Sequence, residues 1–599
     1  AKCQGKPMAG PFRLGCIPTI APFVLSEVMA QCRQQYPELQ LLLREDTSDN
    51  CLHALAEGRL DMVLLALPYE TGAFHTEVLA QDAFKLVLHK DWQDRGFNKD
   101  ISQWPDESIF LLEREHCLTN HAVKACELED SRKVNPFFAT DPNKRMEEFE
   151  AMVARVHKNG LKVVMDFVPN HVARVYHSDM KPEGVRDFGQ DDDVNKGFDP
   201  QNNFYYLPHT QFQIPDGVNP PVKPEGPYIE SPAKASGNDV FSAKPTIDDW
   251  FETVKLNYGV DILNGRSSHF DPIPSTWIKM VEILKYWSAK GVDGFRCDMA
   301  EMVPYEFWSY MNSAIKVQRP DAFLLAEVYN PNEYRNYIHL GKMDYLYDKV
   351  ELYDKLKEIV QGKSQTEPIT NIQKGLADIE HHMLHFLDNH DEQRLASPEF
   401  AGSAENGKPL MVVSATISTS PTMIYFGQEV GEAGNENGGF GSHSRTSIFD
   451  YVGVPNHQRW MNGGKFDGGQ LSNSEKELRD FYKKLLNFSL KSSALMGEFQ
   501  EIHSANATNK KGYLPEMYSF VRWSDTQKLI VIANFSTSKA SQFELIIPKE
   551  IIQKWHLKDG RYTIVDQLYQ SKSTLKVING QGKTKIEMKP SESFIFELK

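Results

Sequence analysis

The sequence lacks long apolar runs, an apolar leader and a surplus of basic residues. No stretch of about 18 or more apolar residues occurs, so no membrane span is expected. Residues 1–15 (AKCQGKPMAGPFRLG) contain no apolar core of a signal peptide. The location stays open, with the cytoplasm as the expectation for the chain as it stands. The net charge of −15 argues against nucleic acid as a partner, because binding phosphates requires a basic face.

Cysteine is scarce and unevenly placed. Of the seven cysteines, only Cys297 lies beyond Cys126. An odd, scattered set does not make a disulfide framework. The uneven placement indicates that two stretches of the chain have different histories.

The length of 599 residues allows several domains with buried cores. Residues 11–67 alternate strand and helix patterns in the order β-α-β-α-β, which implies a parallel sheet. A second small unit follows from about residue 75. We therefore expect an α/β domain at 1–138, with its first lobe at 1–74 and part of a second lobe at 75–138.

A longer α/β series follows this domain. Strands are expected near 161–166, 293–297, 322–326, 343–347, 383–388 and 421–426, and helices near 275–290, 305–317, 351–361 and 475–489. Such alternation is typical of a (β/α) barrel, which we place at 139–494. Residues 172–250 are a long insert with little periodicity. The short β runs of 495–599 predict an antiparallel sandwich.

Carboxylates end four apolar blocks of the barrel region. The blocks are LKVVMDFVPNH (161–171), VDGFRCDMAE (292–301), AFLLAEVY (322–329) and MLHFLDNHDEQR (383–394). Side chains alternate across a strand, so Arg296 and Asp298 share a face, where the arginine favours an ionised, nucleophilic carboxylate. Glu327 ends an apolar strand and suits general acid work, and Asp391 after His390 is placed to stabilise positive charge.

In order, spacing and identity these blocks resemble the conserved regions of the α-amylase family of glycoside hydrolases, over about residues 140–599. The resemblance implies a retaining double displacement on α-linked glucans. It makes Asp298 the nucleophile, Glu327 the acid/base and Asp391 the transition-state stabiliser. It also implies a substrate site, an inserted domain B at 172–250 and a C-terminal domain C. The implied substrate-binding residues are Asp166, His171, Arg296 and His390.

Residues 253–274 further resemble bacterial members of the family, in particular Bacteroidetes-like ones, through the stretch TVKLNYGVDILNGRSSHFDPIP. One departure stands out. The family's barrel begins with two βα units whose motifs are not found in 1–140. Six candidate strands remain instead of eight, and strand number is tied to tilt and shear, so this set is not expected to close as the same barrel. We therefore expect impaired activity.

The resemblance requires no cofactor, but a calcium ion stays open. Hard cations prefer clustered oxygen ligands, and Asn170 with Asp191 to Asp193 provides such oxygens. The alternative is that these aspartates form a solvated acidic loop.

Residues 10–68, from GPFRLGC to VLLALP, resemble the effector-binding domain of LysR-type regulators. Over about 11–140 the resemblance is greatest to the peroxide-sensing OxyR branch, through LLEREHCLTNHAVKAC with Cys117 and Cys126. It implies that one thiol reacts with peroxide and the second resolves it into a disulfide. No helix-turn-helix domain is seen before it, so no nucleic acid is expected to bind through this chain.

Three functions therefore stay open. The first is a retaining α-glucan hydrolase or transglycosylase that uses Asp298, Glu327 and Asp391. The second is a redox-sensing regulatory module that uses Cys117 and Cys126. The third is an accidental or artificial fusion of two partial domains with neither function.

Overall fold

The computed structural model describes residues 10–17, 20–36, 38–46, 48–65, 74–77, 79, 139–176, 178, 184–218, 228–434, 454–508 and 511–599. They fall into two compact units, one from the ranges Ala1–Leu161, Ala173–Gly197 and Tyr206–Glu252, the other from Lys162–Val172, Phe198–Tyr205 and Thr253–Lys599. Each unit is described by itself.

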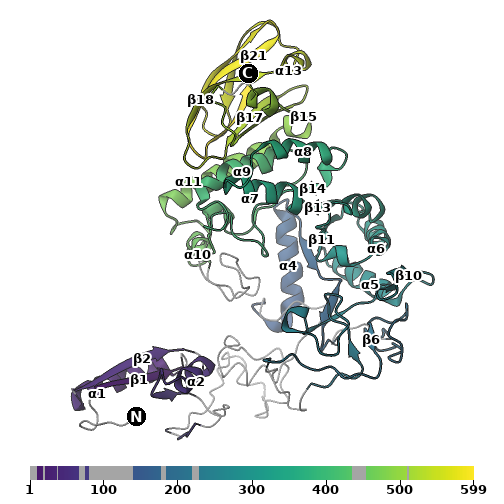
Figure 1. The fold of residues 1–599 in the computed structure, drawn as a ribbon, viewed down its shortest axis with the longest axis vertical. Helices are drawn as coiled ribbons and strands as arrows, with labels where there is room; N and C mark the ends of the chain where they lie inside the picture. The colour runs from purple at the N-terminus through teal and green to yellow at the C-terminus, as the bar shows by residue number, and fades with distance from the viewer. Residues whose placement is uncertain are drawn as a thin grey trace. The chain divides into compact units, whose positions relative to one another are not determined.

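A small parallel sheet forms the first part of the chain, drawn purple in Figure 1. Its elements are β1 (Gly10–Cys16), α1 (Ala21–Gln35), β2 (Leu39–Glu45), α2 (Ser48–Ala56) and β3 (Met62–Leu64). The central strand β1 pairs in parallel with both β2 and β3. Cys51 and Ala54 of α2 pack with Leu60 in its core. The β-α-β-α-β prediction for this segment is confirmed.

A five-stranded parallel sheet positions the carboxylate blocks. Its order is β14-β13-β12-β11-β4, with β4 (Val164–Phe167), β11 (Gly294–Cys297), β12 (Phe323–Ala326), β13 (Tyr345–Tyr347) and β14 (Met383–Leu384). The helices of this series are α5 (Ser275–Ala289), α6 (Tyr305–Gln318), α7 (Asp354–Val360), α8 (Glu367–Gly375), α9 (Ala404–Thr416), α10 (Pro455–Met461) and α11 (Asn473–Lys491). The predicted alternation of strands and helices is confirmed over these residues.

The sixth predicted strand, at 421–426, is wrong. Only Thr422 forms a parallel bridge there, with His385. The reason lies in Pro421, which has no amide hydrogen and so cannot extend a ladder backwards from Thr422. Among the strands that the structure describes, β4 and β14 end the sheet. Val164 of β4 and Val168 directly after it are 41% and 42% exposed.

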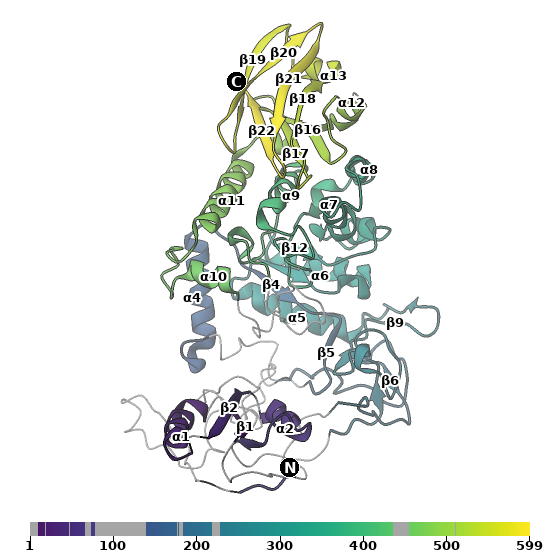
Figure 2. The same ribbon diagram turned by 60° about the vertical axis from the view of Figure 1, so that its left-hand side comes forward.

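The C-terminal residues form an eight-stranded antiparallel sheet, drawn yellow in Figure 2. Its strands are β15 (Glu498–Glu501), β16 (Met517–Trp523), β17 (Lys528–Asn534), β18 (Ser541–Ile547), β19 (Gly560–Asp566), β20 (Lys572–Ile578), β21 (Gln581–Met588) and β22 (Ser593–Leu598), with helices α12 (His503–Ala507) and α13 (Lys549–Lys554). Alternate side chains of β16 and β17 enter two different hydrophobic cores. Both faces of these two strands are therefore buried, as their almost unbroken apolar sequence requires.

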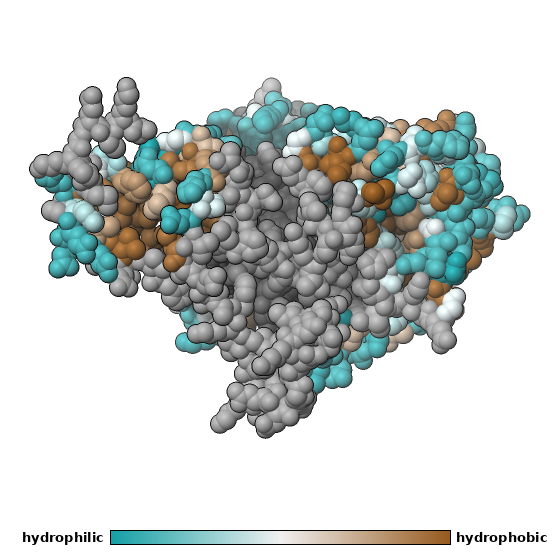
Figure 3. All heavy atoms as spheres, turned by 90° about the horizontal axis from the view of Figure 1, so that it is seen from below, coloured by the Kyte–Doolittle hydropathy of each residue, from teal (hydrophilic) through white to brown (hydrophobic). Residues whose placement is uncertain are grey.

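Short strands occur in and beside the insert: β5 (His171–Ala173), β6 (Tyr206–Leu207), β7 (Ala233–Lys234), β8 (Thr253–Lys255), β9 (Val260–Asp261) and β10 (Ser267–Ser268). Helix α4 (Arg145–Lys158) precedes them in the chain. On the face shown in Figure 3, hydrophobic residues lie in small groups between hydrophilic ones. No helix in the described ranges is both long and apolar enough to cross a membrane.

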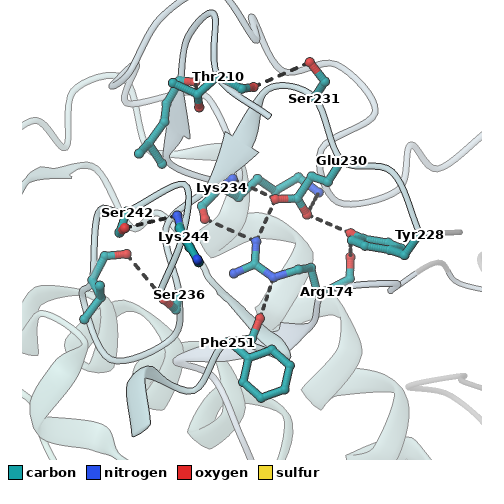
Figure 4. Close-up of polar contacts among 12 residues, drawn as sticks. Arg174, Thr210, Tyr228, Glu230, Ser231, Lys234, Ser236, Ser242, Lys244 and Phe251 are labelled. Atoms are coloured by element: carbon teal, nitrogen blue, oxygen red, sulfur yellow. Dashed lines mark hydrogen bonds and ion pairs between the residues drawn. The ribbon is translucent and has the colours of Figure 1, made fainter. Parts of the chain in front are cut away.

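A buried ion pair holds the insert together (Figure 4). Arg174 Nη1 lies 2.6 Å from Glu230 Oε1, and both side chains are only 4% exposed. Arg174 Nε donates to the carbonyl of Phe251, while Tyr228 Oη and the Lys234 amide donate to the Glu230 carboxylate. Because buried charges are tolerated only when paired and hydrogen-bonded, the insert has to fold so that this network forms.

We expect Arg174→Met to open the insert locally, because Glu230 stays buried without its cation. Breaking one side of a buried pair typically costs roughly 3–5 kcal/mol. Amide hydrogen exchange in residues 228–252 should therefore accelerate. Lys244→Met is the control, since Lys244 and Asp216 form an exposed pair of the kind that contributes little. Equal exchange in the two variants would contradict the assignment.

Candidate active site

Strand pairing brings three carboxylates to one edge of the parallel sheet. Arg296 of β11 stands opposite Asp166 of β4 in the ladder. The pairing continues beyond the strands, because the Asp298 amide donates to a carbonyl of β4 and the Glu327 amide to a carbonyl of β11. The carboxyl ends of parallel strands lie together, so Asp166, Asp298 and Glu327 meet there.

The Arg296 guanidinium contacts all three of these carboxylates. Its Nη1 lies 2.7 Å from Asp298 Oδ1 and 3.0 Å from Asp166 Oδ1. Its Nη2 lies 3.2 Å from Glu327 Oε2. Arg296 is 8% exposed, and its guanidinium carbon lies 5.8 Å from the centre of the Tyr347 ring. One fork-shaped cation can bind several carboxylate oxygens, which suits arginine and not lysine to this position.

Asp298 is an ionised carboxylate at neutral pH. Burial raises its pKa to about 6, while the charge and hydrogen bond of Arg296 oppose this shift. At pH 7 the unprotonated form therefore predominates. An ionised carboxylate held in a poorly solvated place can act as a nucleophile.

Glu327 is 4% exposed and bound by further donors. The Met299 amide donates to its Oε2 over 2.9 Å, and the Tyr329 hydroxyl donates to its Oε1. Burial raises the pKa of Tyr329, and the charges of Glu327 and Asp391 raise it further, so this phenol keeps its proton. The Asp391 carboxylate therefore lies close enough to Tyr329, the hydrogen-bond partner of Glu327, to raise the pKa of its hydroxyl.

Asp391 and His390 form a pair on the turn after β14. His390 Nε2 lies 3.1 Å from Asp391 Oδ2. The amides of Asp391 and Glu392 both donate to Asn389 Oδ1, which shapes the turn. The Asp391 side chain is 41% exposed, so it can meet a substrate from solvent.

His171 belongs to a second polar group, on the segment after β4. Burial, with the charge of Lys255, lowers the pKa of His171 to about 4, so the imidazole is neutral at pH 7. Asn170 Nδ2 lies 3.2 Å from His171 Nδ1. Asn170 Oδ1 accepts a hydrogen bond from the ammonium of Lys255.

The candidate calcium ligands have protein partners. The amide oxygen that Asn170 would offer a metal binds the Lys255 ammonium. Asp191 pairs with Arg186, Asp193 pairs with Lys196, and Asp192 accepts from Tyr206 Oη. No group of three or more His, Cys, Asp or Glu side chains in the described ranges is arranged to hold a metal ion.

Three residues of this region were not predicted: Tyr329, Tyr347 and Lys255. Tyr329 lies two residues beyond Glu327, so the period-2 pattern of a strand end could have placed both on one face. Tyr347 and Lys255 come from other strands, and nothing in their local sequence links them to the carboxylates.

The predicted redox pair, Cys117 and Cys126, lies outside the described residues. Three thiols of the same N-terminal part are described, those of Cys16, Cys32 and Cys51. Cys16 and Cys51 are fully buried, and burial, with the charge of Cys51, raises the pKa of Cys16 to about 11. A thiol with such a pKa is unreactive at neutral pH.

Comparisons with known proteins find similarity to a different family in each part of the chain. Residues 5–156 match the LysR substrate binding domain, and residues 273–462 match the α-amylase catalytic domain. The transcriptional regulator EstR of Acinetobacter baylyi is 35% identical over 132 residues, which are 22% of this chain and 44% of that protein. OxyR of Escherichia coli K12 is 33% identical over 128 residues, 21% of this chain and 42% of OxyR.

The chain thus spans less than half the length of these curated relatives. The crystal structure of an Anoxybacillus α-amylase superimposes with a TM-score of 0.51 at 19% identity, covering 79% of this chain and 82% of that one. The second part of the chain therefore has the α-amylase fold.

We expect Arg296→Met to lower the unfolding temperature, and to lower it more at pH 8 than at pH 5. Without the guanidinium the clustered carboxylates repel one another. Arg296 lowers the pKa of Asp298, so its loss raises that pKa above about 6, and proton uptake by Asp298 at pH 5 relieves the repulsion. At pH 8 the cost should be about 3 kcal/mol.

Differential scanning calorimetry at the two pH values measures this difference. Arg335→Met is the matched control, because Arg335 pairs with the single, exposed carboxylate of Asp378 and should respond equally at both. An equal loss for Arg296→Met at pH 5 and pH 8 would show that the guanidinium does not hold ionised acids.

Proposed function

We propose that the second part of the chain, which carries an α-amylase-family catalytic domain, cleaves α-linked glucans with retention of anomeric configuration. The observation that supports this most strongly is the arrangement around Arg296, where one guanidinium contacts Asp166, Asp298 and Glu327 from three adjacent strand ends. A retaining glycosidase needs an ionised nucleophile and a second carboxyl close by.

In the proposed first step, an Asp298 oxygen attacks the anomeric carbon as the bond from that carbon to the glycosidic oxygen breaks. Glu327 gives its proton to the leaving oxygen. A covalent glycosyl ester on Asp298 results, and Asp391 stabilises the positive charge that develops on the sugar.

In the second step Glu327, now a carboxylate, takes a proton from water. The resulting nucleophile attacks the same carbon from the opposite side and releases Asp298. A sugar hydroxyl in place of water would give transfer instead of hydrolysis. Neutral His171 and the His390–Asp391 pair are proposed to bind sugar hydroxyls, which accept and donate hydrogen bonds at once.

The exposed side of β4 suggests that substrate binding is weaker than in a complete barrel. Val164 and Val168 stand partly in solvent there. We therefore propose that the chain's activity is impaired mainly through a raised KM, because Arg296 contacts Asp298 and Glu327 while the side of β4 beside them is exposed.

We expect Asp298→Asn to lower kcat on soluble starch and on an aryl α-glucoside by roughly a thousandfold or more, because the amide cannot form the ester. In the unsubstituted chain kcat/KM should rise with pH through about 6, as Asp298 ionises. Asp321→Asn, at an exposed carboxylate paired with Lys162, is the control and should leave both constants unchanged. Undiminished hydrolysis by Asp298→Asn would refute the mechanism.

A second function is proposed for the first part of the chain. The match of residues 5–156 to the LysR substrate binding domain supports a redox-sensing role for Cys117 and Cys126. Peroxide would oxidise one thiolate to a sulfenic acid with release of hydroxide. The other thiol would then displace hydroxide, released as water, to form the disulfide.

After treatment with hydrogen peroxide, peptide mass mapping should find a Cys117–Cys126 disulfide, and a thiol reductant should remove it. Cys16 serves as an internal control, because its raised pKa should keep it reduced. Oxidation of Cys16 with Cys117 still reduced would overturn this second proposal.

A further inference from the structure

We infer that the buried ammonium of Lys255 takes the place of a calcium ion at Asn170, so that the α-amylase-like part of the chain folds without calcium. The inference goes beyond the proposed function, because it concerns how the site is held and not whether it turns over. Lys255 is a positioning residue in this account, and it touches none of the reacting atoms.

Two kinds of oxygen bind the ammonium. Lys255 Nζ donates to the side-chain oxygen of Asn170 and to the carbonyl of Met302, the latter over 3.1 Å. Amide and main-chain carbonyl oxygens are the neutral ligands that calcium takes in proteins. The lysine is 2% exposed and Asn170 is fully buried, so the contact is shielded from water.

The position of these oxygens links two segments of the site. Asn170 directly precedes His171 on the segment after β4, and Met302 follows Asp298 on the segment after β11. Lys255 ends β8, a strand that neither segment belongs to. A single ammonium therefore joins the histidine's segment to the nucleophile's segment, as a bridging metal ion would.

The charges around Lys255 leave little attraction for a divalent cation. A cavity of about 280 Å³ beside it is lined by Arg266, Glu301 and Glu306 among others. The two acids are matched by Lys255 and Arg266. The Glu301 carboxylate also accepts the amides of Tyr329 and Asn330 over 2.7 and 3.0 Å. A calcium ion would add two positive charges next to an ammonium in a poorly solvated place, where charge repulsion is strong.

The first experiment compares the purified full chain with and without EDTA and then with added calcium chloride. We expect thermal unfolding temperatures that agree within about 1 °C, and no stoichiometric calcium by elemental mass spectrometry. An unfolding temperature that is lower with EDTA and is restored by added calcium would overturn the inference. Neither readout needs substrate, so an inactive but calcium-independent protein would refute the proposed function alone.

The second experiment removes the charge. Lys255→Met keeps the length and leaves the oxygens of Asn170 and Met302 without their cation, which should lower the unfolding temperature by roughly 3–8 °C. Lys255→Arg, which keeps a cation, should lower the unfolding temperature by less. Lys162→Met, at an exposed lysine, is the control and should shift it by less than about 1 °C.

A Lys255→Met protein as stable as Lys162→Met would overturn the bridging role. If Lys255→Met does not accumulate as folded protein, the EDTA and metal-content measurements on the unsubstituted chain still decide the matter.

Discussion

The candidate active site depends on the contacts between the Arg296 guanidinium and three carboxylates. Asp298 and Glu327 are largely buried and Asp166 is 57% exposed, and a cation between these three carboxylates offsets their mutual repulsion. Arg296 supplies that cation at 2.7 to 3.2 Å from each. Its position follows from the ladder, because β11 lies between β4 and β12 and so presents its side chain to both neighbours. The order of the strands therefore determines which carboxylates Arg296 can contact, and with them the chemistry of the site.

Much of this arrangement could be predicted from local sequence. Alternation along GFRCD puts Arg296 and Asp298 on one face and Cys297 on the other, and the structure has the first two in contact and Cys297 fully buried. Short strand patterns in the sequence likewise located β1, β11, β12, β16 and β17. The failure at 421–426 has a partly local cause, since Pro421 begins that segment and has no amide hydrogen to extend the ladder from Thr422.

What the sequence could not predict depends on contacts between distant segments. Lys255 lies in the run TVKLN, where a lysine between apolar residues usually points to solvent. Lys255 is buried because β8 lies beside the segment after β4, and the hydrophobic periodicity of the sequence does not predict that contact. Tyr347 is similar, because its place beside Arg296 depends on the order of strands in the sheet. Asn170 was left open as a calcium ligand, and its contact with Lys255, 85 residues away, could not be predicted from the local sequence.

The two buried cations, Arg296 and Lys255, bind different kinds of oxygen, and each has the chemistry that its oxygens require. Arg296 faces charged oxygens in several directions, and a planar guanidinium donates along fixed axes to all of them. Lys255 faces neutral oxygens, and a compact ammonium can donate to an amide and a carbonyl without leaving a net negative charge. A site built on both side chains keeps its geometry through covalently attached charges, which no chelator removes.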